Sequence, residues 1–324
     1  MNCSATGEKL RIGEYFQHGT RWLLRLDTRS VSHFRGRIIP PRGNDRRPAI
    51  IFLHGGVQPM PLDTLKKDVS SQATQCRFLA AGYIIVAATS RSRAEDPQTR
   101  DALVDCLAVI DYVKKLPRVD PKSVVNFAGS GGGSLALELA GETELCAVAA
   151  GEPANILFTG MLTKDTIKHR GGDLMNDLME NSRKYYTPEL QKFTEDKIKK
   201  ISCPVFITHS DVHLINRINN EIVIPTMRAL GKPYEVMFIP GQQHGFYNGY
   251  VHPAGTQVYG ALACFYSRHL VTKPNAVDRS LIKLDPVGDP GTQAERDPSA
   301  KANRAALREQ AKKAKESGQA PVKD

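Results

Sequence analysis

Residues 126–134 read NFAGSGGGS, and this stretch decides the fold because it joins an apolar run to a helix-forming segment. The apolar run, residues 124–128, is predicted to be a strand, and residues 135–140 lie in the helix that follows. A sharp turn between them needs small side chains two residues before and two after its apex, and Ala128 and Gly132 meet this need around Ser130. The sequence therefore predicts a tight turn that presents the Ser130 hydroxyl above the carboxyl end of a strand.

A glycine-rich turn of this kind can instead bind phosphate, so that alternative has to be weighed. A P-loop requires Gly-Lys-Ser/Thr, and no lysine follows here. The dinucleotide fingerprint read from Gly129 and Gly131 would need Gly or Ala at the position of Ser134, and it normally follows the first strand of its domain. The pattern favours a nucleophilic serine over a nucleotide-binding turn.

Outward from this turn, short β-rich runs alternate with helical stretches, which indicates an α/β fold with a mostly parallel sheet covered on both faces. Residues 20–40 predict one or two antiparallel edge strands. The expected central strands are 49–53, 83–88, 124–128, 146–150, 204–208 and 234–239, and the main helices are 64–81, 99–116 and 255–270. We expect one domain over 1–271, with a small helical cap inserted at about 155–200, and a basic tail over 272–324 that is disordered or partly helical.

A serine hydroxyl needs a base, and His244 is the best placed of the histidines because it follows the last predicted strand through a loop. The glycine after it, Gly245, gives the backbone freedom there. At the end of the 49–53 strand, Gly55 and Gly56 would let backbone N–H groups approach a substrate carbonyl oxygen. Together with the N–H of Gly131 they form the candidate oxyanion hole.

These motifs give the chain its resemblance to a known family. The serine turn, Val119-Asp120-Pro121 upstream of it, His54-Gly55-Gly56, and Gly245-Phe246 after His244 resemble the dienelactone-hydrolase and prolyl-oligopeptidase-like branch of the α/β-hydrolases over residues 35–270. The resemblance implies an eight-stranded, mostly parallel sheet and a serine, acid and histidine in that chain order. The chain departs from the pattern at Ala128, where the family more often has glycine, and at Ser130, where dienelactone hydrolases carry cysteine.

The acid of the site is the least determined residue. The family spacing of His-Gly, two residues and Asp would place the acid at His213, whereas the chain has Asp211 two residues earlier. Asp211 is the first choice, on the assumption that the loop is shifted in register. Glu152 is the second, because some α/β-hydrolases mount the acid after the preceding strand, and Glu221 is the third.

His209 and His213 alternate with Asp211, as metal ligands on an extended segment could, but no further ligand cluster accompanies them. We therefore expect neither a metal nor a cofactor. The expected function is a serine hydrolase that cleaves a carboxylic ester through Ser130, His244 and Asp211. The alternatives are a small peptidase or aminoacyl hydrolase of prolyl-oligopeptidase type, and a non-catalytic binding protein of the same fold. An ester is favoured over a peptide because about 48 residues precede the 49–53 strand, too few for a propeller.

Composition and charge limit the kinds of partner and the compartment that are expected for the protein. The 324 residues are 41% hydrophobic, and the apolar stretches are shorter than the ~20 residues that span a bilayer, so no membrane span is expected. The net charge of +10 comes without any nucleic-acid-binding motif, so specific nucleic-acid recognition is not expected. Six cysteines without CxxC spacing favour a reducing compartment, and the N-terminus does not resemble a signal peptide, which predicts a cytoplasmic protein. The expected substrate is a small-molecule ester or a short peptide, and the oligomeric state is left open.

Overall fold

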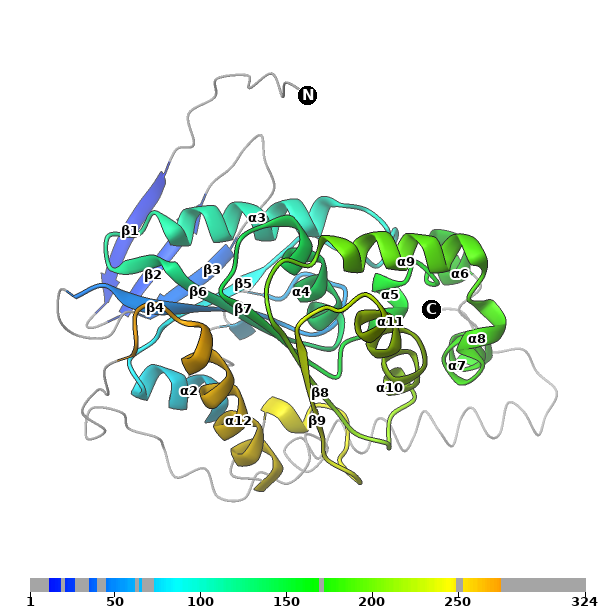
Figure 1. The fold of residues 1–324 in the computed structure, drawn as a ribbon. Helices are drawn as coiled ribbons and strands as arrows, with labels where there is room; N and C mark the ends of the chain where they lie inside the picture. Colours follow the sequence, from blue (N-terminus) through cyan, green and yellow to red (C-terminus); the bar gives the residue numbers. More distant parts are fainter. Residues whose placement is uncertain are drawn as a thin grey trace, which may run out of the picture.

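Six parallel strands, β4 to β9, form the centre of the molecule (Figure 1). The computed structural model describes residues 12–18, 21–26, 35–39, 45–61, 64–65, 73–168, 172–248 and 253–274. The strands are β1 (Ile12–His18), β2 (Arg21–Leu26), β3 (Arg35–Ile39), β4 (Arg47–Leu53), β5 (Ile84–Thr89), β6 (Val119–Gly129), β7 (Ala147–Gly151), β8 (Val205–His209) and β9 (Tyr234–Phe238). The apolar runs of β4, β5 and β7 are buried along nearly their whole length, as expected of strands covered on both faces.

Helices cover both faces of the sheet. The long ones are α2 (Ala73–Ala80), α3 (Asp101–Lys114), α4 (Ser130–Glu142), α7 (Gly172–Glu180), α9 (Pro188–Lys200) and α12 (Pro253–His269). The short ones are α5 (Asn155–Phe158), α6 (Lys164–Lys168), α8 (Ser182–Tyr185), α10 (Ile215–Ile218), the π-helical η1 (Asn219–Val223), α11 (Ile224–Ala229) and the 3-10 turn η2 (Phe246–Asn248).

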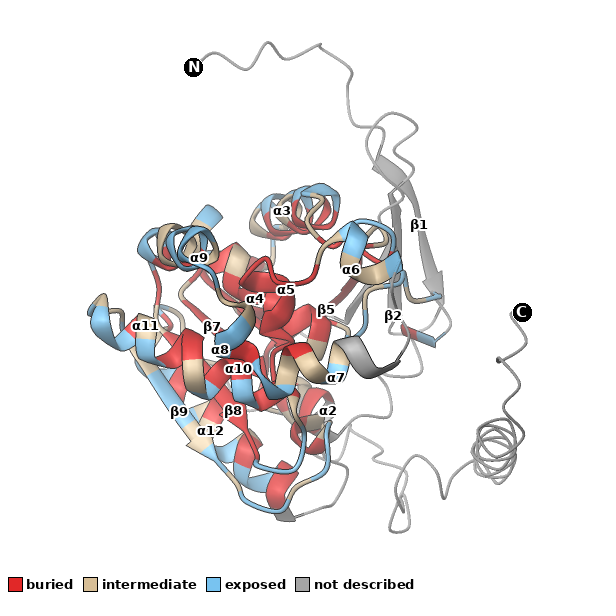
Figure 2. Cartoon of the chain, turned by 90° about the vertical axis from the view of Figure 1, so that its right-hand side faces the viewer, coloured by how far each residue is buried: buried red, intermediate tan, exposed pale blue. Residues whose placement is uncertain are grey.

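The buried side chains form two clusters, one on each face of the sheet (Figure 2). One cluster joins the sheet to α3, α4 and the helices between β7 and β9, and the other joins it to α2 and α12. The sheet order is β1-β2-β3-β5-β4-β6-β7-β8-β9, so β6 lies in the middle of the parallel part. Because parallel strands point the same way, the segments that follow β4, β6, β7, β8 and β9 meet at one edge.

The predicted architecture is confirmed: a mostly parallel sheet has helices on both faces. Among the described residues the sheet has nine strands rather than the eight expected, because the segment before β4 contributes three antiparallel strands instead of one or two. Helix α2 occupies the second half of the predicted 64–81 helix, and residues 66–72 lie outside the described residues. The predicted tail from residue 275 onward also lies outside them. Within the described ranges, no helix has the length and apolar character needed to cross a membrane.

Candidate active site

Ser130 occupies the turn between β6 and α4, and its backbone is strained. Its φ angle is 52°, in the left-handed region that costs a non-glycine residue about 1 to 3 kcal/mol. A Cβ atom on Gly131 would lie 2.1 Å from the Gly56 carbonyl oxygen, and one on Gly132 would lie 2.3 Å from the His54 carbonyl oxygen. The glycines that follow Ser130 therefore let the loop of residues 54–56 pack directly against the start of α4.

A chain of hydrogen bonds fixes the loop of residues 54–56. The Nδ1 atom of His54 lies 2.7 Å from the Gly55 carbonyl oxygen, which can only accept, so this nitrogen carries the proton. The other ring nitrogen, Nε2, accepts from the Thr89 hydroxyl at 2.9 Å, and that hydroxyl accepts the Met60 N–H at 2.8 Å. These hydrogen bonds tie the His54 ring to the loop and to Thr89. The loop also lies close to Ser130, since a Cβ on Gly55 would be 3.3 Å from the Ser130 Cβ.

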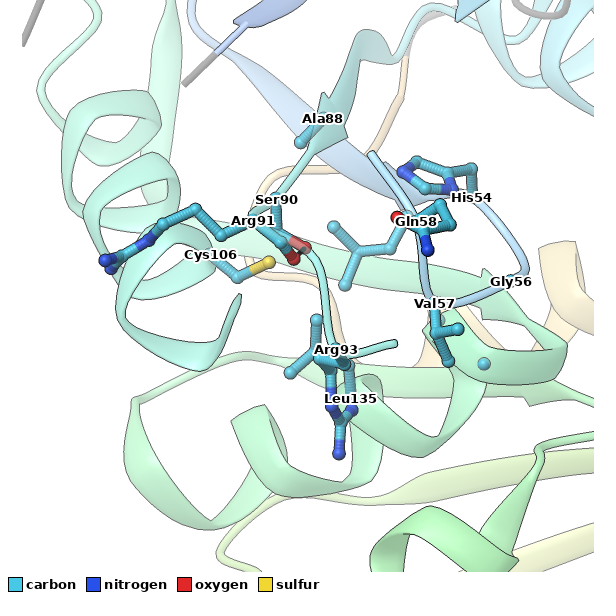
Figure 3. Close-up of a pocket in the computed structure, with 13 residues that line it drawn as sticks. His54, Gly56, Val57, Gln58, Ala88, Ser90, Arg91, Arg93, Cys106 and Leu135 are labelled. Atoms are coloured by element: carbon cyan, nitrogen blue, oxygen red, sulfur yellow. Dashed lines mark hydrogen bonds between the residues drawn. The ribbon is translucent and has the colours of Figure 1, made fainter. Parts of the chain in front are cut away.

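The space behind this loop is nearly filled. Figure 3 shows a cavity bounded by Gly56 and Val57 on one side and by Cys106 and Leu135 on the other. Its volume of about 20 Å³ suits about one water molecule and excludes a substrate. The loop is therefore supported from behind, which keeps its N–H groups in place.

Glu152 pairs with His244. Its Oε2 atom lies 2.9 Å from His244 Nδ1 and also accepts the Gly245 N–H at 2.8 Å. Glu152 is fully buried and has a φ angle of 43°, so a second strained non-glycine residue follows a strand end at this site. The imidazole itself is partly exposed, with 29% of its side-chain surface accessible. This arrangement leaves His244 Nε2 available to a partner on the open side of the ring.

Hydrogen bonds keep the buried Glu152 carboxylate ionised. Burial alone would raise its pKa, but hydrogen bonds from His244, Asn216 and the Gly245 N–H outweigh that effect and hold the pKa below its usual range. A charged acid beneath the imidazole favours proton uptake by the ring.

A line of buried amides supports the acid. Asn216 Nδ2 donates to Glu152 Oε1 at 2.9 Å, and Asn219 Nδ2 donates to the Pro153 carbonyl oxygen at 3.2 Å and to Asn216 Oδ1 at 3.4 Å. Asn155 Nδ2 donates to Asn219 Oδ1 at 2.6 Å. Sequence reasoning missed these residues; the only available signal was that Asn216 and Asn219 stand three residues apart, each next to an isoleucine, Ile215 and Ile218.

The structure corrects the predicted acid. Asp211 is exposed and accepts the Gly241 N–H at 2.7 Å, on the loop that leads from β9 to His244. It follows β8, whereas Glu152 follows β7, the strand next to the serine strand. The third candidate, Glu221, accepts a hydrogen bond from the Ser182 hydroxyl at 2.7 Å and pairs with Arg183 at 3.9 Å. The carboxylate that faces His244 is therefore Glu152 and not Asp211 or Glu221.

Ser130 and the Glu152–His244 pair lie at the same carboxyl edge of the sheet. Gly129 and Gly151 are register partners in β6 and β7, so Ser130 and Glu152, the residues after them, project from neighbouring strands about 4.8 Å apart. The Tyr247 ring packs over both glycines, since a Cβ on either would lie within 2.5 Å of a ring atom. Glu152 in turn binds His244, so serine, acid and histidine gather on one side of the molecule. The sequence analysis did not predict this role of Tyr247. The only signal for it in the sequence is that two adjacent strands each end in a glycine.

The two other histidines of this region do not gather around a metal. The His213 ring stacks on the His244 ring with centroids 4.6 Å apart, and the His209 ring packs against Phe238 at 5.2 Å. Burial lowers the pKa of His213, and the neighbouring His244 lowers it further, which keeps this ring neutral near physiological pH. Among the described residues, no group of three metal-ligating side chains converges.

Comparisons with known proteins relate this chain to one sequence family. The sequence model of the prolyl oligopeptidase family matches residues 92–270, more than half of the chain. Among curated proteins, no sequence matches the chain. The matched segment contains Ser130, Glu152 and His244, and it excludes the loop of residues 54–56.

Solved structures with a similar fold include several esterases. A thermophilic esterase from Thermogutta terrifontis, Est2, superposes with a TM-score of 0.55 at 20% identity, covering 78% of this chain and 95% of the esterase. A hyperthermophilic esterase from the archaeon Pyrobaculum calidifontis superposes with a TM-score of 0.53 at 20% identity, covering 72% and 81%. The Thermogutta esterase phosphoramylated by tabun gives a TM-score of 0.54 at 19% identity, covering 83% of this chain and 100% of that one. Likeness at this level of identity shows the α/β-hydrolase fold.

Proposed function

The chain belongs to the prolyl oligopeptidase family, and we propose that it is a serine hydrolase that cleaves carboxylic esters. The observation that carries this proposal is the pairing of buried Glu152 with His244, at the end of the strand next to the one that leads into the strained turn at Ser130. A serine held in that turn and a histidine oriented by a carboxylate are the parts that acyl transfer requires. In this assignment Ser130 is the nucleophile, His244 the base and Glu152 the acid.

The first step forms an acyl-enzyme. His244 Nε2 takes the proton from the Ser130 hydroxyl, and the serine oxygen attacks the ester carbonyl carbon. The negative charge that develops on the carbonyl oxygen is held by the N–H of Gly131 and by N–H groups of the Gly55–Gly56 loop. Glu152 stabilises the imidazolium formed at this stage, and the imidazolium then donates its proton to the leaving alcohol.

The second step releases the acid. Water takes the place of the alcohol, His244 removes one of its protons, and the resulting hydroxide attacks the acyl carbon. The bond to Ser130 breaks as the serine oxygen regains a proton from the imidazolium. The same N–H groups hold the oxyanion in both steps, so the loss of one of them costs about 3 kcal/mol in each transition state.

Esters are favoured over peptides as substrates by the fold comparisons. The similar solved structures from Thermogutta terrifontis and Pyrobaculum calidifontis are esterases, and one of them is phosphonylated by sarin. The family name itself supports a second candidate, cleavage of short peptides or aminoacyl groups. Ester leaving groups need less protonation than amines, so a site of this design that cleaves amides also cleaves activated esters.

A substrate panel tests the proposal. Hydrolysis of p-nitrophenyl esters and aminoacyl anilides is compared for the wild type, for Ser130→Ala, and for Ser267→Ala, a control at an exposed serine on α12. We expect ester hydrolysis that is lost in Ser130→Ala and unchanged in Ser267→Ala. Anilide cleavage that exceeds ester cleavage would favour the peptidase candidate, and ester cleavage retained in Ser130→Ala would refute the assignment.

The domain organisation and compartment are part of the same proposal. The helices between β7 and β8 serve as a small cap over the site, and the tail from residue 272 is an appendage of the hydrolase domain. A reducing compartment, the cytoplasm, is supported by the free thiols of four described cysteines, Cys106, Cys146, Cys203 and Cys264. Deleting the tail is expected to leave ester hydrolysis intact.

A further inference from the structure

A second cavity lies away from the serine, between the loop before α3 and helices α3, α4 and α9. Its volume is about 300 Å³, much larger than that of the cavity in Figure 3. Four basic side chains line it, and we call them the cavity cations: Arg93, Arg100, Lys197 and Lys200. Cations gathered from two separate segments, the one before α3 and α9, suggest that the cavity holds a negatively charged group.

The cavity cations outnumber the carboxylates that neutralise them. Glu138 Oε1 lies 3.2 Å from both Arg93 Nη2 and Lys197 Nζ. Glu142 pairs with the other two cavity cations, at 3.2 and 3.5 Å. Two carboxylates therefore serve four cations, which leaves two positive charges at the cavity.

A third carboxylate at the cavity is neutralised from outside it. Asp196 also lines the cavity, but its partners are Lys192 at 2.8 Å and Lys199 at 3.5 Å. Neither of these lysines lines the cavity. Asp196 therefore does not cancel the two surplus charges.

Arg93 is built into the site and is incompletely bonded. It is only 5% exposed, and its Nε and Nη2 atoms donate to the Pro97 carbonyl oxygen at 3.3 and 3.1 Å. Its Nη1 atom is buried and has no hydrogen-bond partner among the residues that the structure describes. An unpaired buried guanidinium nitrogen is costly, so Arg93 keeps hydrogen-bonding capacity that its own contacts do not use.

Helix dipoles explain only part of this basic cluster. Lys197 and Lys200 lie in the last turn of α9, where the negative end of the helix attracts cations. Arg93 and Arg100 come instead from the segment before α3, where no helix ends. Thr99 and Arg100 line the cavity just before α3 begins, so the positive end of that helix faces the cavity and adds to the attraction for an anion.

We propose that this cavity binds a phosphate group, either free phosphate or the phosphate of a small monoester. Phosphate carries a charge of about −1.5 to −2 near pH 7, which matches the two surplus positive charges better than a single carboxylate does. The volume exceeds what phosphate alone requires, and Leu103 and Phe193 supply an apolar wall for an attached group. Glu138 follows Ser130 by eight residues on α4, about 12 Å at 1.5 Å per residue, so the phosphate site is separate from the ester-cleaving centre.

Calorimetric titration with inorganic phosphate, at constant ionic strength set by sodium chloride, tests the proposal. The double variant Arg100→Gln/Lys200→Gln removes the two surplus charges at side chains that are 62% and 58% exposed, so the fold should be retained. Lys168→Gln is the matched control, because it removes an α6 lysine that is 65% exposed and whose partner, Asp165, also lies outside the cavity. Glu142→Gln adds one surplus charge.

We expect saturable binding of one phosphate per chain, weakened at least about tenfold in the double variant, unchanged in Lys168→Gln and tightened in Glu142→Gln. A parallel titration with glycerol 3-phosphate distinguishes the sources: tighter binding than phosphate indicates a monoester, and equal binding indicates free phosphate. Two results overturn the proposal. One is no saturable binding to the wild type, and the other is equal weakening in the double variant and in Lys168→Gln. Hydrolytic activity is not the readout, so this test is independent of the proposed function.

Discussion

Replacing Glu152 with glutamine tests which carboxylate serves His244. The carboxylate accepts three hydrogen bonds, two at Oε2 from His244 and the Gly245 N–H, and one at Oε1 from Asn216. A glutamine has one oxygen and one NH2 group, so at least one of these donors would face another donor. The negative charge beneath the imidazole is lost whichever way the amide is turned.

The magnitude of the effect follows from the distance between the paired groups. Unit charges about 3 to 4 Å apart attract by about 4 to 6 kcal/mol at an effective dielectric constant of about 20. The imidazolium forms only as the reaction proceeds, so this attraction stabilises the transition state and not the resting enzyme. Glu152→Gln should therefore lower kcat/KM about 10³- to 10⁴-fold, at about 1.4 kcal/mol per factor of ten.

Steady-state hydrolysis of a p-nitrophenyl ester measures the effect, with Asp211→Asn as the matched control. The control changes a carboxylate that bonds to the Gly241 N–H, and an asparagine oxygen can keep that bond. We expect Asp211→Asn to keep kcat/KM within about twofold of the wild type, as for other exposed sites away from the reacting atoms. A large loss in Asp211→Asn together with a small loss in Glu152→Gln would refute the assignment of the acid.

Three further predictions concern stability and positioning. Because the folded state holds the pKa of Glu152 below its usual value of about 4.3, ionised Glu152 stabilises the fold above that pH, and the stabilisation is lost as pH falls through the lowered value. Urea unfolding over a pH series should show the wild type losing this advantage over Glu152→Gln under acid conditions, and a pH-independent difference would contradict the argument. Asn216→Ala removes a hydrogen bond to a charged carboxylate and should lower kcat about tenfold with little change in KM; a change confined to KM would count against a positioning role. Gly151→Ala places a methyl group 2.5 Å from the Tyr247 ring and should lower the free energy of unfolding by about 1 to 3 kcal/mol. In a Tyr247→Ala background the same substitution should cost much less, and additive losses in the double variant would contradict the contact.

The sequence predicts the parts of the site whose chemistry is local. The turn at Ser130 is recognisable because only small residues fit its two flanks, and the loop at Gly55 and Gly56 is recognisable because it follows a buried apolar strand. His244 could be chosen because it follows the last strand of a parallel sheet. Each of these inferences needs only the residue types and the order of the strands.

The acid could not be chosen from the sequence because both candidates follow adjacent strands at the same edge. The loop that carries His244 contacts both carboxylates, but it brings the imidazole to Glu152 and only a backbone N–H to Asp211. The path of this loop depends on hydrogen bonds between segments that are far apart in the sequence. Glu152 is favoured in the structure because Asn216, 64 residues further along the chain, binds its second oxygen. Strand β1, which precedes the predicted edge strands, was not predicted for a similar reason, because its evidence in the structure is its antiparallel pairing with β2.

Mapping the adduct of a fluorophosphonate probe by mass spectrometry tests the central claim most directly. If Ser130 is activated by His244 and Glu152, the wild type should carry a single adduct on the peptide that contains residue 130, and labelling should slow greatly in Glu152→Gln. An adduct on another serine, or a folded protein that remains unlabelled, would contradict the account.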